Sequence, residues 1–371
     1  MKVLQVGKYY PPYWGGMETA VKDISECLSN EVEMEVLVAN SDSHCVEEVQ
    51  HGVSIMRLLN IHTLFSQPIT PGLFGELRRR QVDIVHLHEP NPLALACFLA
   101  SGNPAKLVIH YHSDIVRQKT LMHFYRPILE RGLERAEIII VGSPHLIESS
   151  PILSKWRRKC VVVPFGIDLD PFLELPRIVR PQSPVQVLAV GRLSYYKGFH
   201  HLIEAVREMD VRLVIAGDGE LRQPLEQQVR ECGLAARVRF AGRIPQAELL
   251  SLYAGSDIFC LPSCERSEAF GLAMVEGMAA GLPVVSTDLP TGVRLVNQHG
   301  STGLVVPPAD SAALARAIMT LAGDANLRVE LGVAARDRAK RLFSRDVMGR
   351  AILDIYRRLD SPAKPEEVLL H

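Results

Sequence analysis

The sequence lacks a net excess of charge, a long apolar run and any pattern of paired cysteines. Its 41 basic and 42 acidic residues give a formal net charge of −1 at pH 7, whereas a general nucleic-acid-binding protein normally carries a large basic excess. No uninterrupted apolar stretch approaches the roughly 18 residues that a membrane-spanning helix needs. We therefore expect neither nucleic acid as a partner nor a transmembrane segment.

The seven cysteines are odd in number, and their distribution does not predict disulfides. Cys260 and Cys264 stand close together, but no second pair follows at zinc-finger spacing, so free thiols in a reducing compartment are the favoured interpretation. The apolar run that begins at Val3 meets a turn at Gly7, before the core of a signal peptide could form. The sequence therefore predicts a cytoplasmic protein.

Short apolar runs alternate with amphipathic stretches in both halves of the chain, and a proline-rich stretch at 175–184 separates the halves. Several runs are continuously apolar, which is typical of parallel strands buried on both faces. The predicted strands are 2–6, 34–39, 53–58, 82–88, 106–111, 137–141, 160–164, 185–190, 212–216, 238–241, 257–261 and 283–286. The predicted helices are 17–28, 199–209, 221–232, 248–254, 271–280, 311–321, 326–342 and 345–359.

This alternation predicts two doubly wound, Rossmann-like α/β domains joined by a linker. Ligands of such sheets bind beyond the carboxyl ends of the strands. We therefore expect the active site in a cleft between the domains, built from residues that directly follow strands.

Two motifs of the second half meet this expectation. Arg192 and Lys197 are five residues apart in a glycine-bounded loop after strand 185–190, where two cations could converge on a diphosphate. Glu268 and Glu276 are eight residues apart, so that a loop carboxylate and a helix carboxylate could face one ligand, and between them Phe270, Gly271 and Leu272 would form a helix N-terminus suited to an anion. The alternatives are a solvated loop with two surface charges and a helix with a polar start.

The first half offers a loop and several histidines. Gly15 and Gly16 join the first strand to the first helix, again as a phosphate-facing loop. His112 follows strand 106–111, and His86 and His88 end strand 82–88. Three such histidines can indicate a metal site, but no acidic metal-binding triplet accompanies them, and we expect no metal.

The ordered set of motifs resembles the retaining glycosyltransferases of family 4, which have the two-domain GT-B fold. The pattern E-x-F-G-x-x-x-x-E from Glu268 to Glu276 carries the resemblance, together with G-R and K-G at 191–198, G-D-G at 217–219, G-R-I-P at 242–245 and G-L-V-V-P at 303–307. The segments H-Y-H-S-D, P-F-G-I-D and N-Q-H-G-S-T-G are similar to segments of bacterial mannosyltransferases of surface-polysaccharide assembly. Phe165 and Arg294 depart from the family, which often has asparagine and an acidic residue at these places.

The resemblance implies a domain at 1–170 on the acceptor side, a nucleotide-sugar-binding domain at 171–344, and a C-terminal helix, 345–371, that returns to the first domain. It also implies roles for single residues. Arg192 and Lys197 would neutralise the donor diphosphate in place of a metal, His112 would lie near the transferred sugar, and Glu268 would bind its hydroxyls. Glu276 would bind the ribose of the donor, and Ile244 would border its base. The donor phosphate or sugar would face the amides of Gly15, Gly16, Phe270, Gly271 and Leu272.

The function that this implies is transfer of a hexose with retention of configuration, most simply mannose from GDP-mannose, onto a glycan or lipid-linked saccharide. The nucleotide sugar is a substrate, and no cofactor is expected. The alternatives are a sugar-nucleotide epimerase of the same fold, a transferase that uses a UDP-sugar, and a sugar-binding protein without activity. A nicotinamide-dependent oxidoreductase is disfavoured because no complete G-x-G-x-x-G follows the first strand.

Two basic clusters allow a peripheral membrane contact. Four cations surround Trp156 at 155–159, and three arginines follow one another at 78–80. Such clusters favour anionic lipid surfaces, with the indole at the level of the headgroups. The alternative for 155–159 is a solvated helix end.

Overall fold

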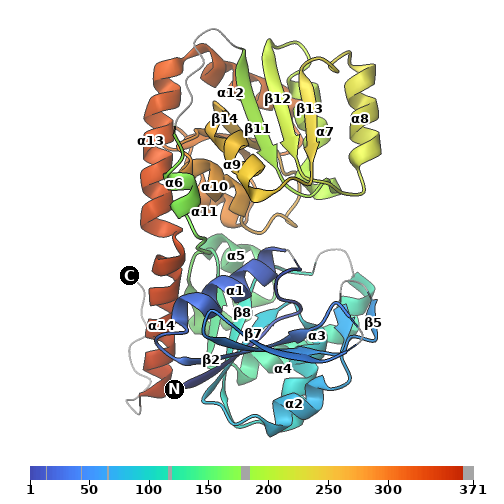
Figure 1. Ribbon diagram of the computed structural model, residues 1–371, viewed down its shortest axis with the longest axis vertical. Helices are drawn as coiled ribbons and strands as arrows, with labels where there is room; N and C mark the ends of the chain where they lie inside the picture. Colours follow the sequence, from blue (N-terminus) through green and yellow to red (C-terminus); the bar gives the residue numbers. More distant parts are fainter. Residues whose placement is uncertain (14, 43, 65–66, 116–118, 177–183, 362–371) are drawn as a thin grey trace. The chain divides into compact units, whose positions relative to one another are not determined.

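The computed structural model describes residues 1–361 except 14, 43, 65–66, 116–118 and 177–183, and the side chains of 119–121 also lie outside it. The chain forms two compact units (Figure 1). The first unit contains Met1–Gly142, Ser150–Gly166 and the segment that begins at Arg345, and the second contains Ser143–Ser149 and Ile167–Ser344. Most of the proline-rich stretch at 175–184 lies outside the described residues.

The first unit is built on an eight-stranded sheet in the order β10-β9-β8-β7-β1-β2-β4-β3. All neighbours in it pair in parallel except β3 and β4, which are antiparallel. Its strands, with the hairpin β5–β6, are β1 (Lys2–Val6), β2 (Glu33–Ala39), β3 (Val46–Gln50), β4 (Val53–Leu58), β5 (His62–Leu64), β6 (Gln67–Ile69), β7 (Ile84–Glu89), β8 (Lys106–Tyr111), β9 (Ile138–Val141) and β10 (Cys160–Val162). Its helices are α1 (Gly16–Leu28), α2 (Leu73–Arg79), α3 (Pro92–Ser101), α4 (Lys119–Arg135), the 3₁₀ helix η1 (Leu153–Lys159) and α14 (Arg345–Asp360).

The second unit has a six-stranded parallel sheet in the order β13-β12-β11-β14-β15-β16. Its strands are β11 (Val185–Val190), β12 (Val211–Ala216), β13 (Val238–Gly242), β14 (Ile258–Leu261), β15 (Val284–Thr287) and β16 (Gly303–Val306). Its helices are α5 (Pro144–Ser149), α6 (Asp170–Leu173), the 3₁₀ helix η2 (Tyr195–Lys197), α7 (Phe199–Ala205), α8 (Arg222–Glu231), α9 (Gln246–Ala254), α10 (Leu272–Ala279), α11 (Gly292–Val296), α12 (Ser311–Gly323) and α13 (Ala325–Leu342).

Every predicted strand is present, with ends that differ from the prediction by at most two residues. The sequence did not predict β3, the β5–β6 hairpin or the helices α2 to α6, and it gave Gly303–Val306 only as a motif, where the structure has the edge strand β16. Helix α7 ends at Ala205 rather than 209, because the amides of Arg207 and Met209 donate to carbonyls three residues earlier instead of continuing the helical ladder.

Burial on both faces explains the continuously apolar runs. All six residues of β7 are buried, including its polar end at His88 and Glu89. The core of the first unit also takes in the apolar stripe of α14, with Ile352 and Tyr356 fully buried against residues of α1 and the sheet. Helix α14 thus packs on the first unit and ends at Asp360, and residues 362–371 of the expected C-terminal segment 345–371 lie outside the described residues.

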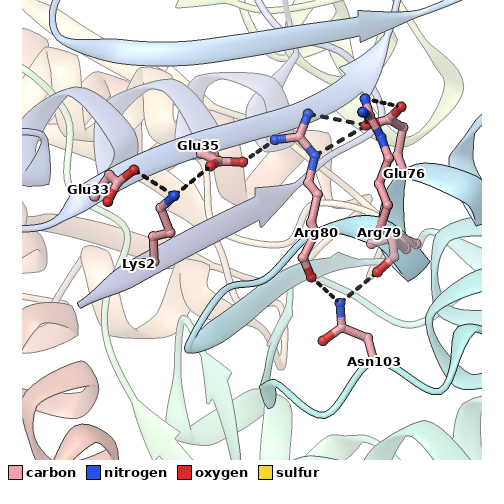
Figure 2. A network of polar contacts seen from close by, with 8 residues as sticks. Lys2, Glu33, Glu35, Glu76, Arg79, Arg80 and Asn103 are labelled. Carbon is pink, nitrogen blue, oxygen red and sulfur yellow. Dashed lines mark hydrogen bonds and ion pairs between the residues drawn. The ribbon is translucent and has the colours of Figure 1, made fainter.

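Ion pairs cross the amino ends of the strands in the first unit, at the edge opposite to the strand ends where ligands are expected (Figure 2). The Lys2 ammonium lies 2.8 Å from a Glu33 oxygen, and Arg80 pairs with both Glu35 and Glu76. Arg79 pairs with Glu76 as well, at 2.5 Å. Arg80 thus links α2 to β2, whereas Arg79 pairs only with Glu76 of its own helix.

None of the helices in the described part of the chain combines the length and the apolar character that crossing a bilayer requires.

Candidate active site

The loop after β11 places its two cations, Arg192 and Lys197, in surroundings of different exposure. The Lys197 side chain is only 12% exposed, and its ammonium lies 2.7 Å from a Glu268 oxygen. The Lys197 side chain passes over Gly191, where an added Cβ would stand 3.3 Å from the Lys197 amine. Arg192 is 75% exposed, with its closest carboxylate oxygen 3.6 Å away on Glu220. In this structure the two cations therefore face different surroundings.

Glu268 completes a buried ionic cluster with Lys197. One Glu268 oxygen accepts hydrogen bonds from Lys197 and from the hydroxyl of Ser263, which is 2.7 Å away. Burial acts to lower the pKa of Lys197, but the carboxylates of Glu268 and Glu276 offset it, and the pKa ends above its usual value. Lys197 therefore stays cationic at neutral pH.

Glu276 lies on α10 and is bound by a tyrosine. The Tyr253 hydroxyl on α9 donates to a Glu276 oxygen at 2.6 Å. Burial raises the pKa of Glu276 to about 7, although the Tyr253 hydrogen bond and the Lys197 charge act to lower it. The structure thus brings Lys197, Glu268 and Glu276 into one electrostatic cluster, and it adds Tyr253 and Ser263, which the sequence did not identify.

The segment between the two glutamates forms the N-terminus of α10, as predicted. Gly271 is the N-cap, with a left-handed φ of 82° that disfavours other residues. Within the described part of the chain, the amides of Gly271 and Leu272 have no hydrogen-bond acceptor. Phe270 is buried and packs edge-on against Phe343 at 5.7 Å. Ile244 is half-buried in the loop between β13 and α9.

In the first unit, Gly15 is the N-cap of α1 and Gly16 its first residue. A Cβ at Gly15 would collide with the carboxylate of Glu18, which bends back and accepts a hydrogen bond from its own amide. Burial raises the pKa of Glu18. An anion that approached these amides would therefore have to displace the Glu18 carboxylate.

His112 follows β8 at the carboxyl edge of the first sheet and is 9% exposed. Its Nε2 lies 2.9 Å from Nδ1 of His88 on the neighbouring strand. Its ring stacks on His110 at 4.6 Å and on Phe165 at 5.0 Å. Burial, helped by the neighbouring histidines, lowers the pKa of His112 well below its usual value. Phe165, which replaces the family's asparagine, thus closes one face of this imidazole.

Three buried histidines, His86, His88 and His110, have ring nitrogens within 4.8 Å of one another. Their rings are stacked, with angles of 11° to 24° between ring planes. An imidazole coordinates a metal in the plane of its ring, so stacked rings direct their lone pairs side by side rather than at one ion. The arrangement does not fit a tetrahedral metal site.

The fold is that of a known class of enzymes. Sucrose-phosphate synthase from Thermosynechococcus elongatus superimposes with a TM-score of 0.78 over 96% of this chain and 98% of its own, with 22% sequence identity. Two parallel α/β units of this kind define the GT-B fold of glycosyltransferases.

Sequence comparison identifies the family. The pattern of Glycosyltransferase Family 4 matches residues 14–171, and that of Glycosyl transferases group 1 matches residues 174–338. The O-antigen chain mannosyltransferase C of Escherichia coli is 32% identical over 96% of this chain and 98% of its own. The D-rhamnosyltransferase WbpZ of Pseudomonas aeruginosa is 33% identical over 93% and 92%. The chain belongs to glycosyltransferase family 4.

Proposed function

We propose that the chain transfers mannose from GDP-mannose to a glycan or lipid-linked saccharide, with retention of configuration and without a metal. The observation that carries this proposal is the buried cluster of Lys197, Glu268 and Glu276, whose cation is held at the carboxyl end of the second sheet. The similarity to a mannosyltransferase of O-antigen assembly supports the sugar and the class of acceptor.

The cluster supports a specific exchange of partners. When the donor diphosphate binds, Lys197 moves its charge from Glu268 to a phosphate oxygen, and the freed Glu268 carboxylate accepts hydrogen bonds from sugar hydroxyls. Arg192, which is exposed, closes onto the second phosphate. The unpartnered amides of Gly271 and Leu272 meet the same anion, and Glu276 accepts from the ribose hydroxyls.

The reaction then needs no protein nucleophile. The bond between the anomeric carbon and the diphosphate oxygen breaks, and the acceptor oxygen bonds to that carbon from the same face. The acceptor proton passes to the leaving diphosphate oxygen. Lys197 and Arg192 stabilise the charge that develops on the leaving group, which is the task that a metal performs in other transferases.

A second donor is supported by a specific observation. The relative WbpZ is a D-rhamnosyltransferase and covers nearly the whole chain at 33% identity, and D-rhamnose is mannose without its 6-hydroxyl. An activated D-rhamnose is therefore the first alternative donor.

The test incubates the purified chain with GDP-mannose, GDP-D-rhamnose or UDP-glucose, a mannose-terminated acceptor with an alkyl tail, and excess EDTA. We expect an α-linked mannoside from GDP-mannose, detected by NMR of the anomeric proton, with Lys197→Ala as the inactive control. A β-linked product would refute retention, and activity that EDTA abolishes and Mg²⁺ restores would refute metal independence. Isomerised donor without acceptor would identify an epimerase.

A further inference from the structure

A chain of buried hydrogen bonds runs across three strands of the first unit and ends at His112. Gln5 on β1 and His88 on β7 are both fully buried. Oε1 of Gln5 lies 2.7 Å from Nε2 of His88, and Nδ1 of His88 lies 2.9 Å from Nε2 of His112. The chain therefore connects the middle of the sheet to the imidazole at its carboxyl edge.

The far end of the chain fixes the orientation of the Gln5 amide. Nε2 of Gln5 lies 2.9 Å from the hydroxyl oxygen of Tyr356 and 3.3 Å from Nδ1 of His86. An amide nitrogen carries two hydrogens and accepts none, so it donates to the Tyr356 oxygen, and the Tyr356 hydroxyl in turn donates to Nδ1 of His86, 2.5 Å away. The amide oxygen must then point to His88, as observed.

This orientation determines the tautomers of both histidines. An amide oxygen only accepts, so the hydrogen of the neutral His88 ring resides on Nε2, and its Nδ1 is a bare acceptor. Nε2 of His112 must then carry the hydrogen that fills the 2.9 Å contact. Because burial keeps both rings neutral at physiological pH, Nδ1 of His112 has no hydrogen.

Nδ1 of His112 is also the nitrogen that a ligand can reach. Among the described histidines, the ring nitrogens that are buried from solvent and have no hydrogen-bond partner are Nε2 of His86 and both nitrogens of His110. Nδ1 of His112 is not one of them, and it has no hydrogen-bond partner within the described part of the chain. The accessible end of this series of hydrogen bonds is therefore the lone pair on Nδ1 of His112.

We propose that Gln5 and His88 are positioning residues that hold His112 as its Nε2–H tautomer, so that Nδ1 accepts a hydrogen bond from a hydroxyl of the transferred sugar. The inference rests on the proposed function for the identity of the ligand. The tautomer itself is a property of the free protein and stands or falls without any donor.

The first test is ¹⁵N NMR of the histidine side chains in the free full-length chain, with His112 assigned by its loss in His112→Ala. Protonated and bare ring nitrogens have well-separated shifts. We expect Nε2 of His112 to be protonated and Nδ1 to be bare. A protonated Nδ1 would overturn the proposal, whatever the activity of the chain.

The second test changes the residue that sets the tautomer. Gln5→Met keeps the shape of the side chain but removes the acceptor of His88, and we expect a mixture of His112 tautomers and a kcat about 10- to 100-fold lower, with the donor KM within about threefold. Tyr356→Phe is the matched control: it removes a buried hydroxyl but leaves His86 as an acceptor for the amide, so the tautomer should persist. A loss of kcat in Gln5→Met with an unchanged His112 tautomer would overturn the positioning role.

The third test identifies the hydrogen bond to the sugar. Fluorine can accept a hydrogen bond but cannot donate one, so at the position that faces His112 the deoxy and the fluoro donor analogues should lose equal kcat/KM. In His112→Ala this loss should disappear for that position alone. A fluoro analogue that performs like the parent sugar at every position would show that the imidazole donates, contrary to the proposal.

Discussion

At the scale of single residues, the two cations of the candidate site differ in what surrounds them. Lys197 is nearly buried against Glu268, whereas Arg192 is largely exposed. Removal of one partner of a buried ion pair leaves an uncompensated charge, which destabilises a protein by about 3–5 kcal/mol. The same change at an exposed arginine costs little.

We expect Lys197→Ala and Arg192→Ala to lower kcat/KM by about a hundredfold or more each, since each cation should contribute about 2–4 kcal/mol to the leaving diphosphate. Only Lys197→Ala should also lower the melting temperature. The double variant Lys197→Ala/Glu268→Gln removes the orphaned charge, so it should recover stability without activity. Kinetics and thermal melts of the three variants check this, and near-normal rates in both single variants would refute the diphosphate assignment.

The pKa of Glu276, raised by burial to about 7, gives a pH dependence of definite sign. Only the ionised carboxylate accepts from both ribose hydroxyls, and its fraction grows as the pH rises through 7. We expect kcat/KM for the donor to rise about tenfold per pH unit below 7 and to level off above it. Glu276→Gln should abolish this limb and lower the plateau by about tenfold or more.

The control for this prediction is Glu89→Gln. Burial also raises the pKa of Glu89 to about 7, but Glu89 lies in the other unit, where it accepts from the Tyr125 hydroxyl at 2.6 Å. The acid limb should persist in this variant. If it vanished there and persisted in Glu276→Gln, the carboxylate that controls donor binding would be Glu89.

At the scale of secondary-structure elements, α14 completes the core of the first unit although it is the last helix of the chain. Gly349 allows its close approach to α1, because a Cβ there would stand 2.5 Å from the sulfur of Cys27. Ile352, Ile355 and Tyr356 are buried along one stripe of the helix. The helix is thus part of the first core rather than an appendage to it.

We expect Ile352→Ala to destabilise the first unit by about 2–5 kcal/mol, because a fully buried isoleucine leaves a cavity. The exposed Asp354 on the same helix gives the control, and Asp354→Ala should stay within about 0.5 kcal/mol. Trp156 belongs to the first unit, so urea unfolding followed by its fluorescence reports on this unit. Equal midpoints for the two variants would contradict the role of α14.

At the scale of the whole molecule, the net charge is near zero, but the chain has a local basic cluster at 155–159. Some of these cations are paired with groups inside the fold. Lys155 pairs with Glu130 at 3.3 Å, and the Lys159 ammonium donates to carbonyls at the end of α4, including that of Ala136 at 2.8 Å. Trp156 is only half-exposed, and its indole N–H is buried, so this N–H does not face the solvent or a lipid headgroup. Arg157 and Arg158 remain exposed.

These two exposed arginines should contribute about 1 kcal/mol each towards an anionic lipid surface. We therefore expect weak, salt-sensitive co-sedimentation with anionic vesicles and none with neutral ones, and Arg157→Glu/Arg158→Glu should abolish it. Arg212→Glu/Arg239→Glu makes the same change of charge at exposed positions of the second unit and should leave it intact. Equal loss in both double variants would show that net charge, and not this cluster, attracts the lipid.

Much of the fold followed from the sequence, because local patterns report burial directly. The continuously apolar runs are typical of parallel strands buried on both faces, and the return of the last helix to the first unit was implied by the family resemblance. The short elements α2, α5 and α6 and the β5–β6 hairpin carry too few periodic residues for such a signal. Helix α3 is apolar almost throughout and shows no stripe, and the 17-residue helix α4 was missed although it is long. The motif residues Lys197, Glu268 and Glu276 were likewise identifiable in the sequence, because they lie in the loop after β11 and in the loop and helix that follow β14.

The partners of those residues were decided only by tertiary structure. Gln5 faces His86, and His88 faces His110, because β7 lies between β1 and β8 in one register, and Gln5 and His88 are 83 positions apart in sequence. Tyr253 likewise meets Glu276 from another helix. A sequence pattern determines which face of its own element a side chain occupies, but a hydrogen bond extends only about 3 Å. Which groups come within that distance depends on strand order and register, and these are fixed by the packing of the whole unit.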